Sequence, residues 1–123
     1  MGIELPTEFE AAIFRHISNR SSDSALQSQL LTVRVMSRTN TGCGCYSDLL
    51  TSPDAPRTLA AYGSHGPLDG PDFESACVEF GGITLLWFKE GRASYLEIAA
   101  FGEFFPEDHA DLEPFKLLEA PAD

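Results

Sequence analysis

Residues 81–101, with the sequence GGITLLWFKEGRASYLEIAAF, constrain the fold of this chain more than any other stretch. An almost continuously apolar run ending at Phe88 is followed by a short polar segment and then by a second run of aromatic and aliphatic residues. Gly91 supplies the positive φ that a tight turn requires, so the stretch predicts a β-hairpin with Glu90 and Gly91 as its loop. Because the first run is apolar at consecutive positions, we expect its strand at the centre of a sheet, covered at least partly on each face.

The register of this hairpin decides which side chains share a face of the sheet. A two-residue loop pairs Lys89 with Arg92, and uninterrupted pairing from there defines two sets of side chains. One face would hold Ile83, Leu85, Trp87, Leu96 and Ile98. The other would hold Thr84, Leu86, Phe88, Tyr95 and Glu97. A slip of one residue would exchange these sets, and the turn alone does not exclude it.

The length and composition predict one folded domain spanning residues 1–123. The chain is 43% hydrophobic and 11% aromatic, and 123 residues suffice for one core without a metal or disulfides. We expect a helical segment over 1–30, a sheet over 31–118 and a frayed tail over 119–123. No apolar run approaches the roughly 20 residues of a membrane span, and the N-terminus is acidic where a secretory signal would be basic. These features predict a cytoplasmic protein.

A helix is predicted to begin immediately after Thr7. Thr7 and Glu10 have the spacing of a capping box, in which each side chain bonds the backbone N–H of the other residue. Phe9, Ile13 and Ile17 then recur at every fourth position and form an apolar stripe. We therefore expect this helix to lie on the sheet.

The pattern then changes from helical to extended. A second capping box beginning at Ser24 predicts a short helix through about Leu30. Over 31–38 the apolar residues alternate with polar ones, which predicts a half-buried strand. In that strand Arg34 and Arg38 are expected on the face opposite the valines.

Further strands are predicted on both sides of the hairpin. The segment 43–50 is expected to form a strand in which glycines allow a bulge or a close backbone approach. A short strand is expected over 58–62, an irregular segment over 63–72, and an edge strand over 115–118.

Charge is the most informative global property. The chain has 8 Lys and Arg against 19 Asp and Glu, a net charge of −11. Residues 1–60 carry five basic and six acidic groups, whereas residues 61–123 carry three and thirteen. The second half therefore predicts a strongly negative surface, which argues against nucleic acid and anionic membranes and for a basic protein partner. Solubility alone is the alternative explanation.

The cysteines allow a metal site or a nucleophile, with reduced buried thiols as the alternative. A zinc site would take its ligands from Cys43, Cys45, Cys77 and one of His65, His109 or His16. The spacing lacks the paired knuckles of common structural zinc sites. A nucleophilic site would combine Cys43 or Cys45 with His65 and Asp48, without any local signature. No glycine-rich phosphate loop is present, so we expect no cofactor.

Glu97 is the one conspicuous polar group of the hairpin. Together with Asp48 it could form an acid–base pair on the sheet face away from the helix. Arg34 and Arg38 are expected on that same face, and an ion-pair network explains all four residues more simply.

Phenylalanines adjoin the most acidic segment of the chain. Phe101, Phe104 and Phe105 stand beside the run 102–113, which has five acidic groups and no Lys or Arg. An aromatic anchor with an acidic rim suits a basic partner protein. The alternative is that the phenylalanines pack into the core.

Three segments carry a family resemblance. They are the run TGCGCYSD at 41–48, the run GITLLWFKEG at 82–91, and Leu96-Glu97 followed by FGEFFP at 101–106. Together they resemble a group of small, uncharacterised bacterial proteins with a Thr-Gly-x-Gly-aromatic strand, a Leu-Phe-x-x-Gly hairpin and a Leu-Glu…Gly-Glu-x-x-Pro pattern. The resemblance implies a compact domain of helices and sheet, of bacterial or phage origin, similar in profile to immunity proteins and with no assigned catalytic residue.

We therefore predict an α+β fold with one or two N-terminal helices on an antiparallel sheet of about four to six strands. The expected function is stoichiometric binding without enzymatic activity, by an immunity-type inhibitor that covers a basic surface of a toxin or nuclease. A phage-encoded DNA mimic that inhibits a nucleic-acid-binding complex, in the manner of anti-CRISPR proteins, and a small cysteine- or metal-dependent enzyme are the alternatives. The expected partner-binding residues are Glu74, Glu79, Glu103, Phe104, Phe105, Glu107, Asp108, Asp111 and Glu113.

Overall fold

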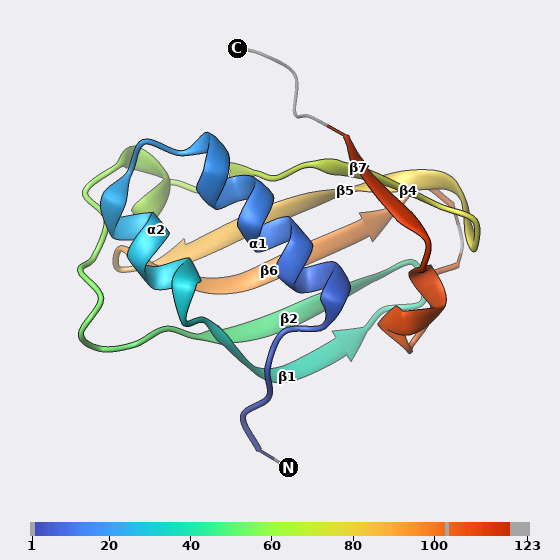
Figure 1. The fold of residues 1–123 in the computed structure, drawn as a ribbon, viewed down its shortest axis with the longest axis horizontal. Coiled ribbons are helices and arrows are strands. Elements are labelled where there is room, and N and C mark those ends of the chain that lie inside the picture. The colour runs from blue at the N-terminus through green and yellow to red at the C-terminus, as the bar shows by residue number, and fades with distance from the viewer. Residues whose placement is uncertain (1, 103, 119–123) are drawn as a thin grey trace.

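Two helices pack on one face of a seven-stranded antiparallel sheet in the computed structural model, which describes residues 2–102 and 104–118 (Figure 1). The strand order is β1-β2-β6-β5-β4-β7, and β3 pairs with the far half of β5. The elements are α1 (Glu8–Arg20), α2 (Ser24–Leu31), β1 (Arg34–Asn40), β2 (Gly44–Leu50), η1 (Ala61–Gly63), β3 (Leu68–Asp69), β4 (Asp72–Ser75), β5 (Val78–Lys89), β6 (Arg92–Ala100), η2 (His109–Leu112) and β7 (Phe115–Leu118). The predicted α+β class is confirmed. The tail predicted over 119–123 lies outside the described residues.

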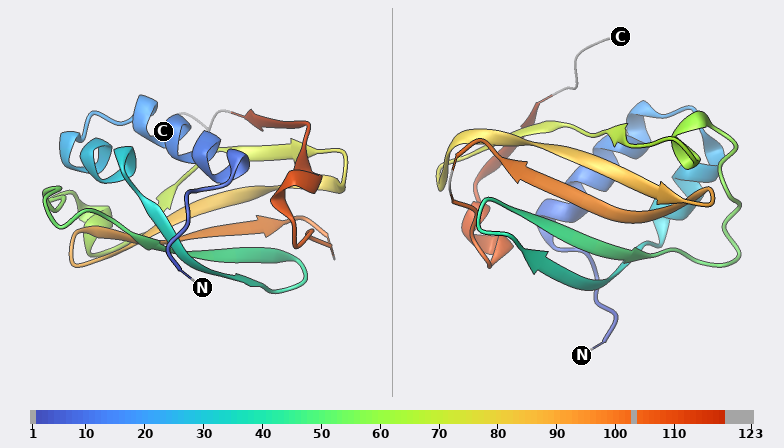
Figure 2. Two further views of the ribbon diagram at one scale, coloured as in Figure 1. Left: turned by 60° about the horizontal axis from the view of Figure 1, so that its bottom comes forward. Right: turned by 180° about the vertical axis from the view of Figure 1, so that it is seen from behind.

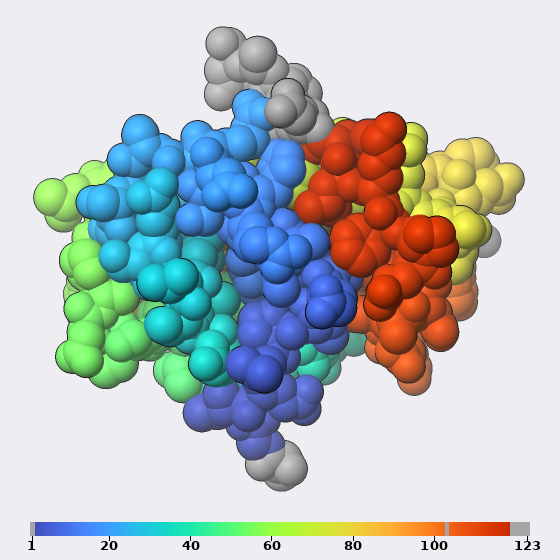
Figure 3. Space-filling view, viewed as in Figure 1, coloured from blue at the N-terminus to red at the C-terminus, as the bar shows by residue number. Residues whose placement is uncertain are grey.

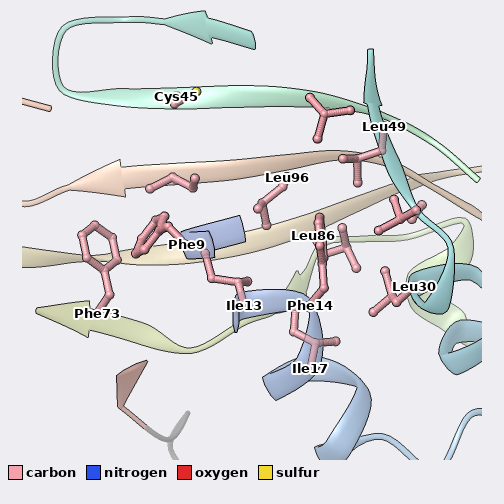
Figure 4. Packing of buried hydrophobic residues seen from close by; sticks show 14 of the residues in the cluster. Phe9, Ile13, Phe14, Ile17, Leu30, Cys45, Leu49, Phe73, Leu86 and Leu96 are labelled. Carbon is pink, nitrogen blue, oxygen red and sulfur yellow. The ribbon is translucent and has the colours of Figure 1, made fainter. Parts of the chain in front are cut away.

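The helix α1 is held on the sheet by the apolar stripe predicted for it. Its N-terminus has the complete capping box of Thr7 and Glu10. Phe9, Ile13 and Ile17 are buried and point at the sheet (Figure 4). They join a single cluster of buried residues that spans α1, α2 and the strands, in which full burial of one large apolar side chain contributes about 1.5–3 kcal/mol.

The helix α2 is capped by Asp23, and the capping box predicted at Ser24 is wrong. The Asp23 carboxylate accepts hydrogen bonds from the backbone of Ala25 and Leu26 and also from the hydroxyls of Thr58 and Tyr62. These bonds tie the segment that follows residue 57 to the helix. The strand predicted over 58–62 is therefore absent, and the short helix η1 takes its place.

The strand β1 contains a bulge that reverses the predicted direction of Arg38. The bulge lies between Val35 and Ser37, and beyond it Arg38 pairs with Ser47, which is fully buried. Arg38 therefore points to the face that carries the helices, whereas uninterrupted alternation would have turned it away.

The hairpin of β5 and β6 has the predicted loop and a shifted register. Glu90 and Gly91 both have positive φ, 51° and 80°, as a type I′ turn requires. Lys89 pairs with Arg92, but a bulge follows, so that Trp87 pairs with Tyr95 and not with Ser94. The bulge shifts the pairing by one residue, and the sets predicted for uninterrupted pairing are wrong.

The shift separates the strands into two well-defined faces. Thr84, Leu86, Leu96 and Ile98 are buried beneath the helices, on what we call the helix face. The opposite face, called the open face below, carries Tyr46, Asp48, Ile83, Leu85, Trp87, Tyr95, Glu97 and Ala99. The view from behind shows no helix across it (Figure 2). In the described part of the chain no helix is long and apolar enough to span a membrane.

Candidate functional site

One end of the sheet gathers segments that are distant in sequence. Because β5 and β6 are antiparallel, the start of β5 lies beside the end of β6. The segment that leaves β6 is fixed by the backbone bond from Phe105 N to Gly42 O (2.8 Å), which ties it to the β1–β2 turn. The hydroxyl of Ser75 bonds Leu112 O at 2.6 Å, so η2 is fixed beside the β4–β5 turn. Figure 1 shows these segments together on its right-hand side.

Five predicted acidic residues lie exposed at this end, which we call the acidic end. They are Glu79, Glu107, Asp108, Asp111 and Glu113. The carboxylate of Asp108 accepts a bond from Ala110 N (2.9 Å) and caps η2. For the other four, no side-chain hydrogen bond or ion pair is found within the described chain. They are free to meet a partner.

The remaining predicted acidic residues are placed differently. Glu74 is exposed on β4, where it pairs in register with Lys116 of β7, so its charge is opposed by a neighbouring cation. Glu103 lies outside the described residues. Glu74 is therefore not counted in the acidic end.

Three phenylalanines are exposed at the acidic end. Phe80 is 68% exposed, Phe101 51% and Phe104 57%. Phe101 N bonds Gly81 O at 2.8 Å, which fixes Phe101 beside the residue that follows Phe80. Phe105 is only 3% exposed and packs against Phe73 and His109, so it cannot act as the predicted surface anchor.

Phe80 was not identified from the sequence. It stands two residues after the buried Val78, where alternation along the strand predicts burial. Gly81 follows with a φ of 67°, which breaks the alternation at this point. The Gly-Gly pair at 81–82 was the available signal for such a break.

Basic side chains gather at the opposite end of the molecule. Lys89 and Arg92 flank the hairpin loop, and the backbone of Thr58 bonds Gly91 O, which places Arg57 nearby. Arg34 begins β1 and, with Arg15 of α1, lines a groove of about 380 Å³ between the two helices. Figure 3 shows this helix-bearing side, with α1, α2 and the C-terminal segment at its surface. These basic side chains lie away from the acidic end, with the exposed Asp54 and Glu90 among them.

A buried polar cluster joins α1 to the sheet beneath the acidic end. Glu10 is 0% exposed and accepts two bonds from Arg38, at 2.7 and 2.9 Å, and one each from Ser47 Oγ (2.5 Å) and Thr7 N (2.9 Å). Burial alone would raise the pKa of Glu10, but the bonds from Arg38, Ser47 and Thr7 outweigh it and lower the pKa below its usual value. Hydrogen bonding to Glu10 in turn raises the pKa of Arg38.

His109 belongs to the edge of this cluster. Its Nδ1 lies 2.9 Å from Thr7 Oγ1 and 3.9 Å from Glu10 Oε2. Burial lowers the pKa of His109, which favours the neutral ring. The cluster fixes η2 to α1 and thereby positions the acidic end. Every buried side-chain nitrogen and oxygen atom of the described chain has a partner, as expected of a structural network.

The cysteines and histidines are not brought together. Cys43 is exposed before β2, whereas Cys45 is buried and burial raises the pKa of its thiol. Cys77 lies in the β4–β5 turn, and His65 follows η1 near the other end of the sheet. Throughout 2–102 and 104–118, no three His, Cys, Asp or Glu residues are grouped as metal ligands. The predicted zinc set and the Cys–His pair with His65 are therefore not assembled here.

Within the part of the chain that the structure describes, Glu97 is not part of an arginine network. Its carboxylate accepts bonds from Trp87 Nε1 (2.8 Å) and Tyr46 Oη (3.5 Å). Asp48 accepts a bond from Ser37 Oγ at 2.8 Å. The predicted ion pairing failed because the bulge in β1 turned Arg38 to the helix face.

Comparisons add no family to these observations. The chain matches no protein-family model, no curated protein and no solved structure.

Proposed function

We propose that the chain is a stoichiometric binding protein whose acidic end covers a basic surface on a partner protein. The observation that carries the proposal is the convergence of five exposed carboxylates and three exposed phenylalanines from separate segments at one end of the sheet. Long-range attraction would accelerate association with a basic partner, because the opposite end carries the positive charge and orients the molecule in the partner's field. Phenylalanines at the centre of such a contact would slow dissociation.

The exposed phenylalanines favour an aromatic-anchored protein–protein contact over imitation of the DNA backbone. A mimic of the phosphate backbone requires spaced negative charges and gains nothing from phenylalanine rings at its contact surface. Aromatic anchors surrounded by charges are the usual composition of a protein–protein interface. Together with the resemblance to immunity-like bacterial proteins, this supports an immunity-type inhibitor acting in the cytoplasm on a basic toxin or nuclease.

Affinity capture from the organism that encodes the chain tests the proposal. The immobilised protein is incubated with lysate at low and high salt, and bound proteins are identified by mass spectrometry. We expect a basic protein to be retained at low salt and released at high salt, because charge attraction is screened. The triple variant Glu107→Gln, Asp111→Asn and Glu113→Gln should lose it.

A matched variant distinguishes the effect of charge at the acidic end from the effect of the net charge of the chain. Asp54→Asn, Asp69→Asn and Glu90→Gln remove the same number of charges from exposed positions outside the acidic end. This control should capture the partner as the unmodified chain does. Equal loss in both variants would show that net charge alone drives binding and would refute the acidic end as the interface. Once a toxic partner is identified, co-expression with the chain should restore growth.

A further inference from the structure

The open face presents aromatic rings and carboxylates in alternation. Along one row of paired residues, Tyr46 lies beside Glu97, and in the next row Asp48 lies beside Tyr95. Trp87 continues the second row on the neighbouring strand. Each carboxylate therefore has an aromatic ring as its cross-strand neighbour. The strand register produces this pattern, since the bulge in β6 brings Trp87 opposite Tyr95.

The rings are fixed against one another. Trp87 and Tyr95 are stacked, with ring centroids 5.8 Å apart and an interplanar angle of 16°. Tyr46 meets Tyr95 edge-on at 5.7 Å. The indole N–H of Trp87 donates to Glu97 at 2.8 Å, so the carboxylate is held at the edge of the rings. Such a preorganised surface loses little side-chain entropy when a ligand binds.

Among residues 2–102 and 104–118, neither Asp48 nor Glu97 makes an ion pair with Lys or Arg. Burial, followed by the negative charge of Glu97, raises the pKa of Tyr95. A cationic ligand would be attracted both by the carboxylates and by the ring faces.

We propose that the open face binds an arginine side chain of a protein partner, with the guanidinium seated against the aromatic cluster of Tyr46, Trp87 and Tyr95 and its N–H groups directed to Glu97 and Asp48. A planar guanidinium can stack on aromatic rings and donate to carboxylates at the same time, whereas a lysine ammonium is a strongly hydrated point charge. A second copy of this chain is a poor occupant, because symmetric pairing would bring identical carboxylates together. The inference rests on the proposed function, since the same basic partner would supply the arginine.

Trp87 makes the site directly observable, because it is the only tryptophan in the chain. The probe is a peptide with blocked termini that contains three arginines separated by glycines. It is titrated into the intact protein at low salt while the indole fluorescence of Trp87 is recorded. We expect a saturable change with the arginine peptide and a weaker one with the matched lysine peptide. Glu97→Gln should weaken arginine binding about tenfold or more, as for a lost hydrogen bond to a charged group.

The glutamine variant keeps an oxygen that can accept the bond from Trp87, and its thermal melt checks that it folds. The pair Asp54→Asn and Glu90→Gln, remote from the face, should bind the peptide like the unmodified chain. Absence of a fluorescence change with the arginine peptide, equal responses to both peptides, or an unaltered Glu97→Gln titration would each overturn the inference. Capture of a basic protein from lysate is a separate readout. If the acidic-end triple variant no longer captures the basic protein, while Trp87 fluorescence does not respond to the arginine peptide, the proposed function is retained and the arginine site is rejected.

Discussion

Glu10 shows how one residue supports the whole acidic end. It is buried and receives four hydrogen bonds from Arg38, Ser47 and the backbone of Thr7, so its charge is compensated without water. Glu10→Gln removes the buried carboxylate that Arg38 bonds and leaves Arg38 with only the exposed Glu4, at 3.1 Å, as a counter-charge. Loss of such a buried partner costs up to about 3 kcal/mol of stability. We expect that loss in urea unfolding at neutral pH, with Glu8→Gln, an exposed change on the same helix, as the control.

The contribution of Glu10 should depend on pH with a definite sign. Its pKa in the folded protein is lowered below the reference value of 4.5, so the unfolded chain binds a proton first as the pH falls. The stabilisation is present above about pH 4.5 and is lost as the pH falls through the folded pKa. The stability difference between the unmodified chain and Glu10→Gln should therefore shrink in acid. A constant difference down to about pH 3 would contradict the pairing.

At the level of elements, the loop between β5 and β6 holds Glu90 in a strained backbone conformation that a substitution can relieve. Glu90 adopts a φ of 51°, which asparagine and glycine tolerate better than glutamate. Glu90→Asn should stabilise the protein by about 0.5–1 kcal/mol, measured as a higher urea midpoint at unchanged slope. Glu90→Gln removes the same charge without the conformational gain and should have little effect. Equal stabilisation by both variants would assign the gain to charge.

Local signals in the sequence were sufficient for some elements and not for others. The capping box of α1 and the Glu90-Gly91 loop were correctly predicted, because both depend on residues within one turn. The bulges in β1 and β6 were not, since they depend on what lies across the sheet. Arg38 turns inward to meet Glu10, a residue 28 positions away.

The candidate site likewise contains some residues that the local sequence could identify and others that depend on contacts across the fold. The acidic residues of the run 102–113 and Phe104 could be identified from composition, and the structure leaves Glu107, Asp108, Asp111, Glu113 and Phe104 exposed. Phe105 looks equivalent to Phe104 in the sequence but is buried against Phe73 of β4. No local sequence pattern predicts this contact. The aromatic–carboxylate pattern of the open face was missed because it exists only in the shifted register.

At the scale of the whole molecule, charge separation leaves like charges crowded at one end. A net charge of −11 disfavours the compact state through self-repulsion, and the acidic end concentrates this cost. Raising NaCl from about 20 mM to about 500 mM shortens the Debye length from roughly 20 Å to below 5 Å. We therefore expect the melting temperature to rise by about 4 °C, which corresponds to about 1 kcal/mol for a chain of this size.

The source of this salt effect can be located with the two triple variants. Glu107→Gln, Asp111→Asn and Glu113→Gln should melt higher at low salt and gain less from added salt, because the repulsion is already relieved. Asp54→Asn, Asp69→Asn and Glu90→Gln should keep most of the gain, since these carboxylates are near the positive end or dispersed. KCl should act like NaCl if screening is the cause. A melting temperature that falls with salt would mean that attractive surface pairs outweigh the repulsion, and the acidic end would then be electrostatically balanced within the free protein.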